Sequence, residues 1–223
     1  MTERVLVVAA HPDDESLGCG GAIAKHIAAG DAVRIYVMTD GVGSRGGPLS
    51  VGNIEQRKER HGMYRRACKV LGTEDVWIFQ FTDNAMDTVP LIEVVRYIEI
   101  HIGQFKPTIV YTHWKGDLNQ DHRVVHDATN IACRPQPGQT VKKLLYFEVP
   151  CSTAWSHSFQ PNYFVDITGT LDTKLKACQE YEVELREYPH PRSTVGISNL
   201  AELRGSHVGV EAAEAFVVGR LVA

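Results

Sequence analysis

Short apolar runs alternate with stretches of helical periodicity over the first two thirds of the chain. The first run, residues 5–10, has no polar interruption, which is typical of a central parallel strand buried on both faces. The pattern predicts strands at 4–10, 32–38, 75–79, 108–112 and 144–149, and helices at 16–29, 54–71, 88–104 and from about Asp121 onward. This alternation predicts an α/β fold with a Rossmann-like, mostly parallel sheet and helices on both faces.

The last third of the chain has a different pattern, because several prolines interrupt it. Here the sequence predicts helices at 168–186 and 195–206 and a late strand near 215–218. We expect these elements to form a small C-terminal cap, about residues 150–223, on a single domain that spans residues 1–223.

Composition narrows the class of protein. The 223 residues suffice for one domain with its own core, and the net charge of -4 provides no basic stripe for nucleic acid. No apolar run approaches the roughly 20 residues of a membrane span, and the N-terminus does not read as a signal peptide, so we expect a cytoplasmic protein without a membrane span. The sequence leaves the oligomeric state open, because the edge strand of a sheet can pair with a second copy of the chain.

The most informative stretch is His11-Pro12-Asp13-Asp14-Glu15, which follows directly after the first expected strand. Ligands in open α/β sheets gather beyond the carboxyl ends of such strands. His11 and Asp14 are three residues apart and can face the same point. A second cluster, residues 117–123, follows another expected strand and contains His122, which we expect as a third metal ligand at the same edge.

Two imidazoles and one carboxylate suit Zn²⁺, although Fe²⁺, Mn²⁺ or Co²⁺ could occupy the same set. A catalytic zinc site keeps one position for water and lowers the pKa of that water to about 7. Asp13, which is beside two ligands but not needed as one, is placed to accept the proton. The alternative interpretation is that Asp13, Asp14 and Glu15 only complement a helix dipole as acids of its first turn.

Residues 11–15, with Gly18, Gly20 and Gly21, resemble the zinc-dependent PIG-L/LmbE-like de-N-acetylase family. The resemblance continues through Thr39-Asp40-Gly41, Arg57 and Glu59, Asp83-Asn84, Asn119-Gln120-Asp121-His122, Arg204-Gly205 and Ala213-Glu214-Ala215-Phe216. It implies hydrolysis of acetamido groups on amino sugars and sugar conjugates. It also implies that His11, Asp14 and His122 bind zinc and that Asp13 acts as general base and then as general acid.

The chain departs from the family pattern at Asn119, where many members have a histidine that stabilises the charge of the tetrahedral intermediate. An asparagine amide can donate a hydrogen bond to an oxyanion but cannot carry a positive charge. His113, at the end of its strand, and His190, in a proline-rich turn, are candidates for a place beside the substrate.

Three further residues are candidates through the resemblance. Arg57 resembles a substrate-binding arginine, with a surface helix charge as the alternative. Asp83 resembles a position that binds sugar hydroxyls, with an Asx turn as the alternative. Asp121 is expected to orient a neighbouring group of the reaction centre by hydrogen bonding and not to bind the metal.

The sequence thus predicts a zinc-dependent hydrolase that removes an acetyl group from a small N-acetylated amino sugar or sugar conjugate. One alternative is a metal-bound sugar-binding protein in which Asn119 marks lost activity, and another is a hydrolase of a non-sugar amide. A nucleotide-binding Rossmann module is disfavoured, because its G-x-G-x-x-G fingerprint would occupy the turn that holds residues 11–15.

Overall fold

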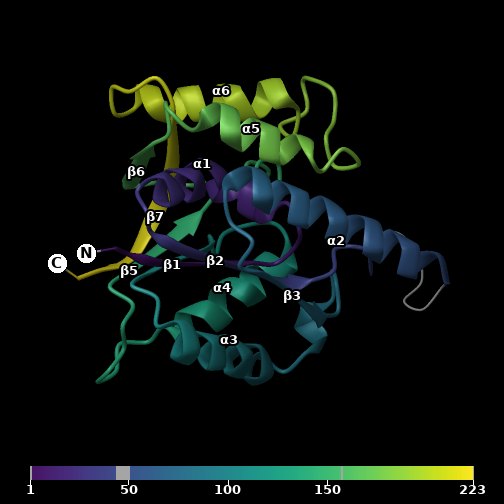
Figure 1. Cartoon of the computed structure of the whole chain (residues 1–223), viewed down its shortest axis with the longest axis vertical. Helices are drawn as coiled ribbons and strands as arrows, with labels where there is room; N and C mark the ends of the chain where they lie inside the picture. The colour runs from purple at the N-terminus through teal and green to yellow at the C-terminus, as the bar shows by residue number, and fades with distance from the viewer. Residues whose placement is uncertain (1, 44–50, 157, 223) are drawn as a thin grey trace.

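The computed structural model describes residues 2–43, 51–156 and 158–222, and within them the strands form one seven-stranded sheet of order β3-β2-β1-β4-β5-β7-β6 (Figure 1). The strands are β1 (Arg4–Ala9), β2 (Ala32–Thr39), β3 (Val76–Phe81), β4 (Ile109–His113), β5 (Lys143–Phe147), β6 (Tyr163–Asp166) and β7 (Ala213–Leu221). Strands β1 to β5 are parallel to one another, whereas β7 runs antiparallel to both β5 and β6.

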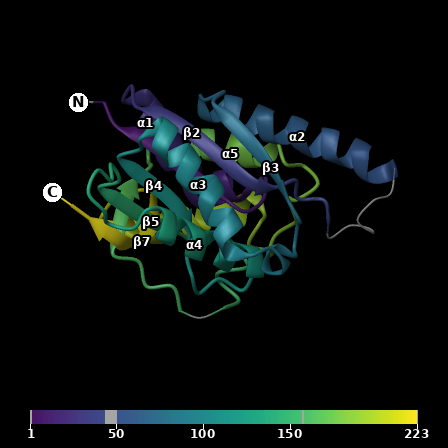
Figure 2. The ribbon, with the colours of Figure 1, turned by 90° about the horizontal axis from the view of Figure 1, so that it is seen from below.

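Helices cover both faces of the sheet (Figures 1 and 2). They are α1 (Asp14–Ala28), α2 (Val51–Leu71), α3 (Leu91–Phe105), α4 (Gln120–Ala132), α5 (Leu171–Gln179) and α6 (Thr194–Ser206), with a short 3₁₀ helix η2 (Met86–Thr88). Helices α1, α2, α5 and α6 pack in the core on one face, and α3 and α4 pack on the other. The α/β fold with a mostly parallel sheet is therefore confirmed. None of the described helices combines the length and apolarity needed to cross a bilayer.

Strand β1 explains the unbroken apolar run, because its side chains alternate between the two cores. Val5 and Val7 pack with the α1 and α2 side, whereas Leu6 and Val8 pack with the α3 and α4 side. All four are completely buried. Burial of each such side chain contributes about 1.5–3 kcal/mol relative to exposure, so β1 is a firm support for the turn that follows it.

The last third of the chain departs from the expected cap. Strands β6 and β7 extend the sheet itself, and β6 was not predicted because only four residues form it. The helix expected at 168–186 ends at Gln179. Tyr181 lies just beyond that end and is buried against α1, with its hydroxyl donating to Glu15 Oε1 at 2.6 Å. This tertiary contact outweighs the local helical pattern.

The strand order reverses at β1 and β4, which lie side by side at the centre of the sheet. The chain leaves β1 into α1 on one face and leaves β4 toward α4 on the other. Such a switch point opens a crevice at the carboxyl ends of the strands. The turn after β1 and the loop after β4 meet there.

Candidate metal centre and active-site cavity

The turn between β1 and α1 has an unusual backbone. Asp13 has φ 124° and ψ -29°, a region that residues other than glycine rarely adopt. Its amide donates to Glu15 Oε2 at 3.1 Å, and the amide of His11 donates to Asp14 Oδ2 at 2.8 Å. These side-chain contacts hold a backbone shape in which three consecutive polar residues can point in different directions.

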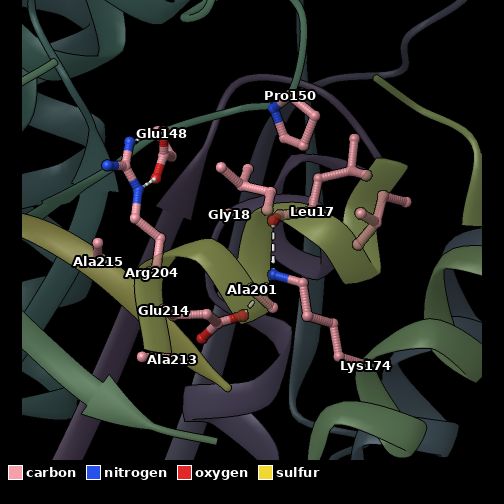
Figure 3. Close-up of a pocket in the computed structure, with 12 residues that line it drawn as sticks. Leu17, Gly18, Glu148, Pro150, Lys174, Ala201, Arg204, Ala213, Glu214 and Ala215 are labelled. Atoms are coloured by element: carbon pink, nitrogen blue, oxygen red, sulfur yellow. Dashed lines mark hydrogen bonds and ion pairs between the residues drawn. The ribbon is translucent and has the colours of Figure 1, made fainter. Parts of the chain in front are cut away.

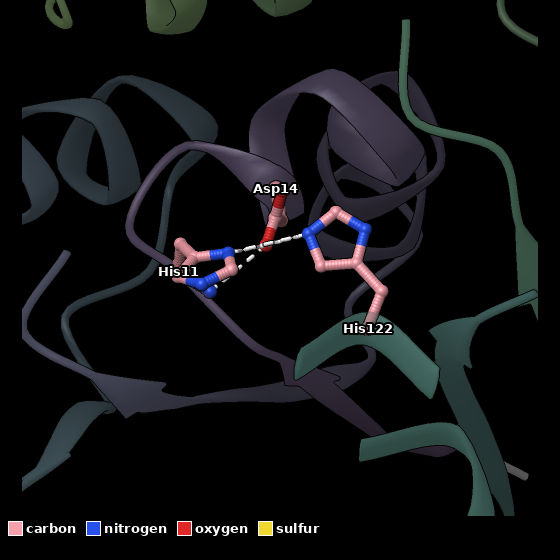
Figure 4. Close-up of side chains that lie close together, drawn as sticks. All are labelled: His11, Asp14 and His122. Carbon is pink, nitrogen blue, oxygen red and sulfur yellow. Dashed lines mark hydrogen bonds and ion pairs between the residues drawn. The ribbon is translucent and has the colours of Figure 1, made fainter. Parts of the chain in front are cut away.

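Three of the expected ligands converge at this turn (Figure 4). His11 Nδ1 lies 3.2 Å from His122 Nε2 and 3.2 Å from Asp14 Oδ2, and His122 Nε2 lies 3.3 Å from Asp14 Oδ2. Ligand atoms bound at about 2.0–2.1 Å in a tetrahedral zinc site are roughly 3.3 Å from one another. The spacing and the chemistry of these donor atoms therefore fit a zinc-type site.

The outer nitrogen of each imidazole faces carboxylates. His11 Nε2 lies 3.1 Å from Asp121 Oδ2 and 3.3 Å from Asp83 Oδ1, and His122 Nδ1 lies 3.1 Å from Asp117 Oδ1. Carboxylates commonly fix the ring orientation of metal-bound histidines in this way. His11, Asp83 and Asp121 form a second group with metal-ligand spacing, but that group contains only one imidazole.

The buried carboxylates create a site that favours positive charge. Burial lowers the pKa of His11, but hydrogen bonds with Asp121 and Asp14 outweigh it and raise that pKa to about 10. Burial acts to raise the pKa of Asp14, yet the charge of His122 and the hydrogen bond with His11 help to bring it well below its ordinary value. A bound cation would likewise stabilise the negative charge of these buried carboxylates.

Asn119 caps helix α4, a role that the sequence interpretation missed. Its Oδ1 accepts hydrogen bonds from the amides of Asp121 at 2.8 Å and His122 at 3.4 Å. Asparagine is among the best residues at this position, and the signal was present in its place just before an expected helix. The cap leaves the side-chain NH₂ group available to a ligand.

His113 lies in the core behind His122. It is completely buried, its Nε2 accepts from the amide of Ala10 at 2.9 Å, and its ring stacks on His122 at 3.9 Å. Burial lowers the pKa of His113 to about 4, so the ring is neutral. This placement argues against the expected substrate contact and makes His113 a support for the orientation of His122.

A polar cavity of about 120 Å³ opens beside the ligands. The residues that line it are His11, Asp13, Gly41, Arg60, Asp83, Asn84, Asn119, Glu184 and Arg192. It thus brings together one ligand and three of the other expected site residues, Asp13, Asp83 and Asn119. Hydrogen-bonding groups dominate its wall, which suits a polar ligand.

Two arginines contact Asp13, and sequence reasoning missed both. Arg60 Nη2 lies 3.3 Å and Arg192 Nη1 lies 3.1 Å from Asp13 Oδ2. The Asp13 carboxylate raises the pKa of Arg192 above its ordinary value, so Arg192 stays fully charged. Arg60 lies one helical turn after Arg57, but only the tertiary structure shows which of the two faces inward.

Arg57 and His190 lie outside the wall of the cavity. The Nε atom of Arg57 pairs with Asp40 Oδ2 at 2.6 Å, and its side chain is 43% exposed. His190 Nδ1 accepts from the amide of Arg192 at 3.1 Å, and its ring packs edge-on to Trp155. His190 thus contacts the segment that carries Arg192, and Arg57 adjoins the cavity-lining Gly41 only through Asp40.

A buried ion pair between Lys174 and Glu214 supports α1 (Figure 3). Helix α1 is kinked at Cys19, and Glu214 accepts from the amides of Gly21 at 2.9 Å and Ala22 at 2.7 Å beyond the kink. Lys174 Nζ donates to the carbonyl of Leu17 at 2.7 Å and pairs with Glu214. The pair satisfies backbone groups that the kink would otherwise leave open, so the metal-ligand turn starts a well-anchored helix.

Comparison with known proteins agrees with this geometry. A family model described as PIG-L, GlcNAc-PI de-N-acetylase, matches residues 6–133, which contain all three converging ligands. The chain is 30% identical to the uncharacterized deacetylase YaiS of Escherichia coli (strain K12), over 80% of this chain and 90% of YaiS. It is 26% identical to diacetylchitobiose deacetylase of Thermococcus kodakarensis, over 83% of this chain and 71% of that protein.

Among solved structures, the conserved protein TT1542 from Thermus thermophilus superposes with a TM-score of 0.79. The two chains are 24% identical, and the match covers 100% of this chain and 97% of TT1542. This likeness shows a shared fold that includes β6, β7 and the helices of the last third.

Proposed function

The chain belongs to the PIG-L (GlcNAc-PI de-N-acetylase) family, and on that premise we propose that it is a zinc-dependent hydrolase that removes the acetyl group from an N-acetylated amino sugar or sugar conjugate. The observation that carries the proposal is the convergence of His11, Asp14 and His122 beside Asp13 at the wall of one polar cavity. Metal-ligand spacing, a carboxylate that is beside the ligands but is not one of them, and space for a polar group are the requirements of metal-assisted amide hydrolysis.

His11, Asp14 and His122 would hold the ion. When bound, zinc lowers the pKa of a water molecule and polarises a carbonyl group. Asp13 takes a proton from the water while the water oxygen bonds to the acetyl carbon. Asp13 then delivers that proton to the sugar nitrogen as the carbon–nitrogen bond breaks. The products are acetate and a free amine.

The cavity wall supports an amino sugar as the substrate. Asp83, Asn84 and Glu184 offer oxygen and amide groups of the kind that bind sugar hydroxyls, and the Asn119 amide can donate to the acetyl oxygen. Diacetylchitobiose deacetylase, whose name states an N-acetylated sugar substrate, is one of the relatives.

Acetate release from defined substrates tests this function. Zinc-reconstituted protein is incubated with N-acetylglucosamine, its 1-phosphate, N,N′-diacetylchitobiose and, as a non-sugar amide, N-acetylethanolamine. We expect acetate from at least one sugar, faster than from N-acetylethanolamine, and a loss of at least a hundredfold in Asp13→Asn at unchanged zinc content. Equal turnover by Asp13→Asn would refute the role of Asp13, and no acetate from any sugar would refute the substrate class.

A further inference from the structure

Hydrolysis of an acetamide places negative charge on the acetyl oxygen, and fixed donors aimed at that oxygen stabilise the transition state. Besides the proposed ligand His11, four residues on the cavity wall carry N–H donors in their side chains: Asn84, Asn119, Arg60 and Arg192. Only the two arginines carry a permanent positive charge. The question is which of them has an N–H group available to a substrate.

Arg60 is buried and its guanidinium is enclosed by protein groups, although its Nε has no hydrogen-bond partner. Its Nη1 lies 3.0 Å from Glu184 Oε1, and its Nη2 donates to the carbonyl of Pro12 and pairs with Asp13. The guanidinium also lies 5.2 Å from the centre of the Tyr181 ring, and its side chain is only 4% exposed. Arg60 therefore acts as an anchor between α2, the ligand turn and the segment after α5.

Arg192 is held on two sides and leaves its third nitrogen available. Its Nη1 donates to Asp13 Oδ2 at 3.1 Å, and its Nε donates to Cys151 Sγ at 3.2 Å. Across the residues that the structure describes, no hydrogen-bond partner is found for Nη2, and the side chain is 20% exposed at the cavity. A guanidinium fixed at Nη1 and Nε has its remaining N–H pair oriented before a ligand arrives.

We propose that Arg192 is a catalytic residue that donates from Nη2 to the acetyl oxygen as that oxygen becomes negatively charged. This inference rests on the proposed deacetylase function. Arg192 supplies the positive charge that Asn119 cannot carry, and His113 cannot reach a substrate because it is completely buried and lies outside the cavity wall. Since arginine does not release its proton, Asp13 serves as the proton donor to the leaving nitrogen.

The same geometry makes a prediction for the product. Acetate presents a carboxylate to the position where the oxyanion forms, and guanidinium groups bind carboxylates through charge-assisted hydrogen bonds. Binding of acetate to the zinc-loaded protein therefore reports on Arg192 without any turnover.

The test compares Arg192→Gln, Arg192→Lys and a control, Arg66→Gln. Arg66 is a surface residue of α2 whose Nε pairs with Glu180 Oε2 at 2.7 Å, away from the cavity. In Arg192→Gln we expect kcat to fall by about 10²–10³-fold with KM changed by only a few fold, and acetate binding measured by calorimetry to weaken about tenfold. Arg192→Lys should retain part of both, and Arg66→Gln should match the wild type within about twofold.

Zinc content and thermal unfolding are measured for every variant. If Arg192→Gln does not fold, Arg192→Lys decides the question through the same two readouts. The proposal would be overturned if both kcat and acetate affinity of Arg192→Gln were within twofold of the wild type. If only Arg192→Lys folds, the same result in that variant would overturn it. If the wild type released acetate from none of the sugars, the function above would fail, and an unchanged acetate affinity in the variant would separately overturn the role of Arg192.

Discussion

The main-chain amide of Asp13 donates a hydrogen bond to the buried carboxylate of Glu15, with 3.1 Å between Asp13 N and Glu15 Oε2. A residue other than glycine at φ 124° costs on the order of 1–3 kcal/mol, which surrounding contacts must offset. Glu15 Oε1 accepts from Tyr181 at 2.6 Å and from Ser16 at 2.7 Å. Glu15 thereby connects the segment after α5 to the strained residue that we propose as the base.

Glu15→Gln tests this connection. The three neighbours donate to the carboxylate, and an amide NH₂ in place of Oε1 is satisfied only if the hydroxyls of Tyr181 and Ser16 turn to accept, so we expect a loss of about 1 kcal/mol in the free energy of unfolding. We also expect at least tenfold lower kcat, because Asp13 loses its support. Denaturant unfolding and acetate release measure the two effects. Tyr181→Phe, which removes only one donor, should cost about 1 kcal/mol; a Glu15→Gln protein as stable and active as the wild type would contradict the account.

Two substitutions at Asn119 separate its capping role from its contact with a ligand. Asn119→Ala should lower the free energy of unfolding by about 1 kcal/mol, whereas Asn119→Ser keeps a capping oxygen and should be nearly as stable as the wild type. Both variants lose the side-chain NH₂, so kcat/KM should fall about tenfold in each. If Asn119→Ser kept full activity, the amide would have no part in the reaction.

The Lys174–Glu214 pair should behave as one structural unit. Glu214→Ala leaves a buried ammonium group without its partner and removes the acceptor for Gly21 and Ala22, so we expect a loss of about 3–5 kcal/mol. Lys174→Met should also destabilise the protein. In denaturant unfolding, the double variant should lose less than the sum of the two single losses. Strict additivity would show that the two side chains do not interact.

His126 should make stability depend on pH. Its Nδ1 donates to the carbonyl of His113 at 2.8 Å and its Nε2 accepts from Asn130 at 2.8 Å, so the neutral ring is fully satisfied. Burial lowers the pKa of His126. The unfolded chain, with a histidine pKa of about 6.5, takes up the proton first, and the contribution of His126 is therefore lost as pH falls below 6.5.

The measurement is denaturant unfolding at pH 7.5 and pH 5.5 for zinc-loaded wild type and His126→Asn. Asparagine keeps a donor toward the His113 carbonyl but does not titrate. The other histidines are common to both proteins, so the smaller loss expected in His126→Asn isolates this ring. An equal loss in the two proteins would show that His126 does not contribute.

Much of the fold and the metal site follows from local pattern. The apolar run of β1 predicts a central strand, and polar residues directly after it predict a site at the sheet edge. Residues 117–123 could be placed at the same edge because β1 and β4 are both parallel strands followed by helices. These inferences need only the period of the strands and the direction of the sheet.

The contacts that shape the cavity depend on long-range packing and could not be predicted in this way. Arg192 contacts Asp13 and Tyr181 contacts Glu15 across the fold, and neither contact has a local signal. His113 looks like a residue at the rim of the sheet, yet the alternation of β4 turns it into the core beside Tyr111. Asn119 reads as a departure from a family pattern, although its capping role accounts for the choice of residue.

Metal content tests the central claim most directly. Protein is stripped with a chelator, reconstituted with zinc, freed of excess metal and analysed for zinc per chain, for wild type, Asp13→Asn, His11→Ala and His122→Ala. We expect one ion per chain in wild type and Asp13→Asn, and almost none in His11→Ala and His122→Ala. Full zinc content in both histidine variants, or no stoichiometric zinc in the wild type, would contradict a metal centre built from His11, Asp14 and His122.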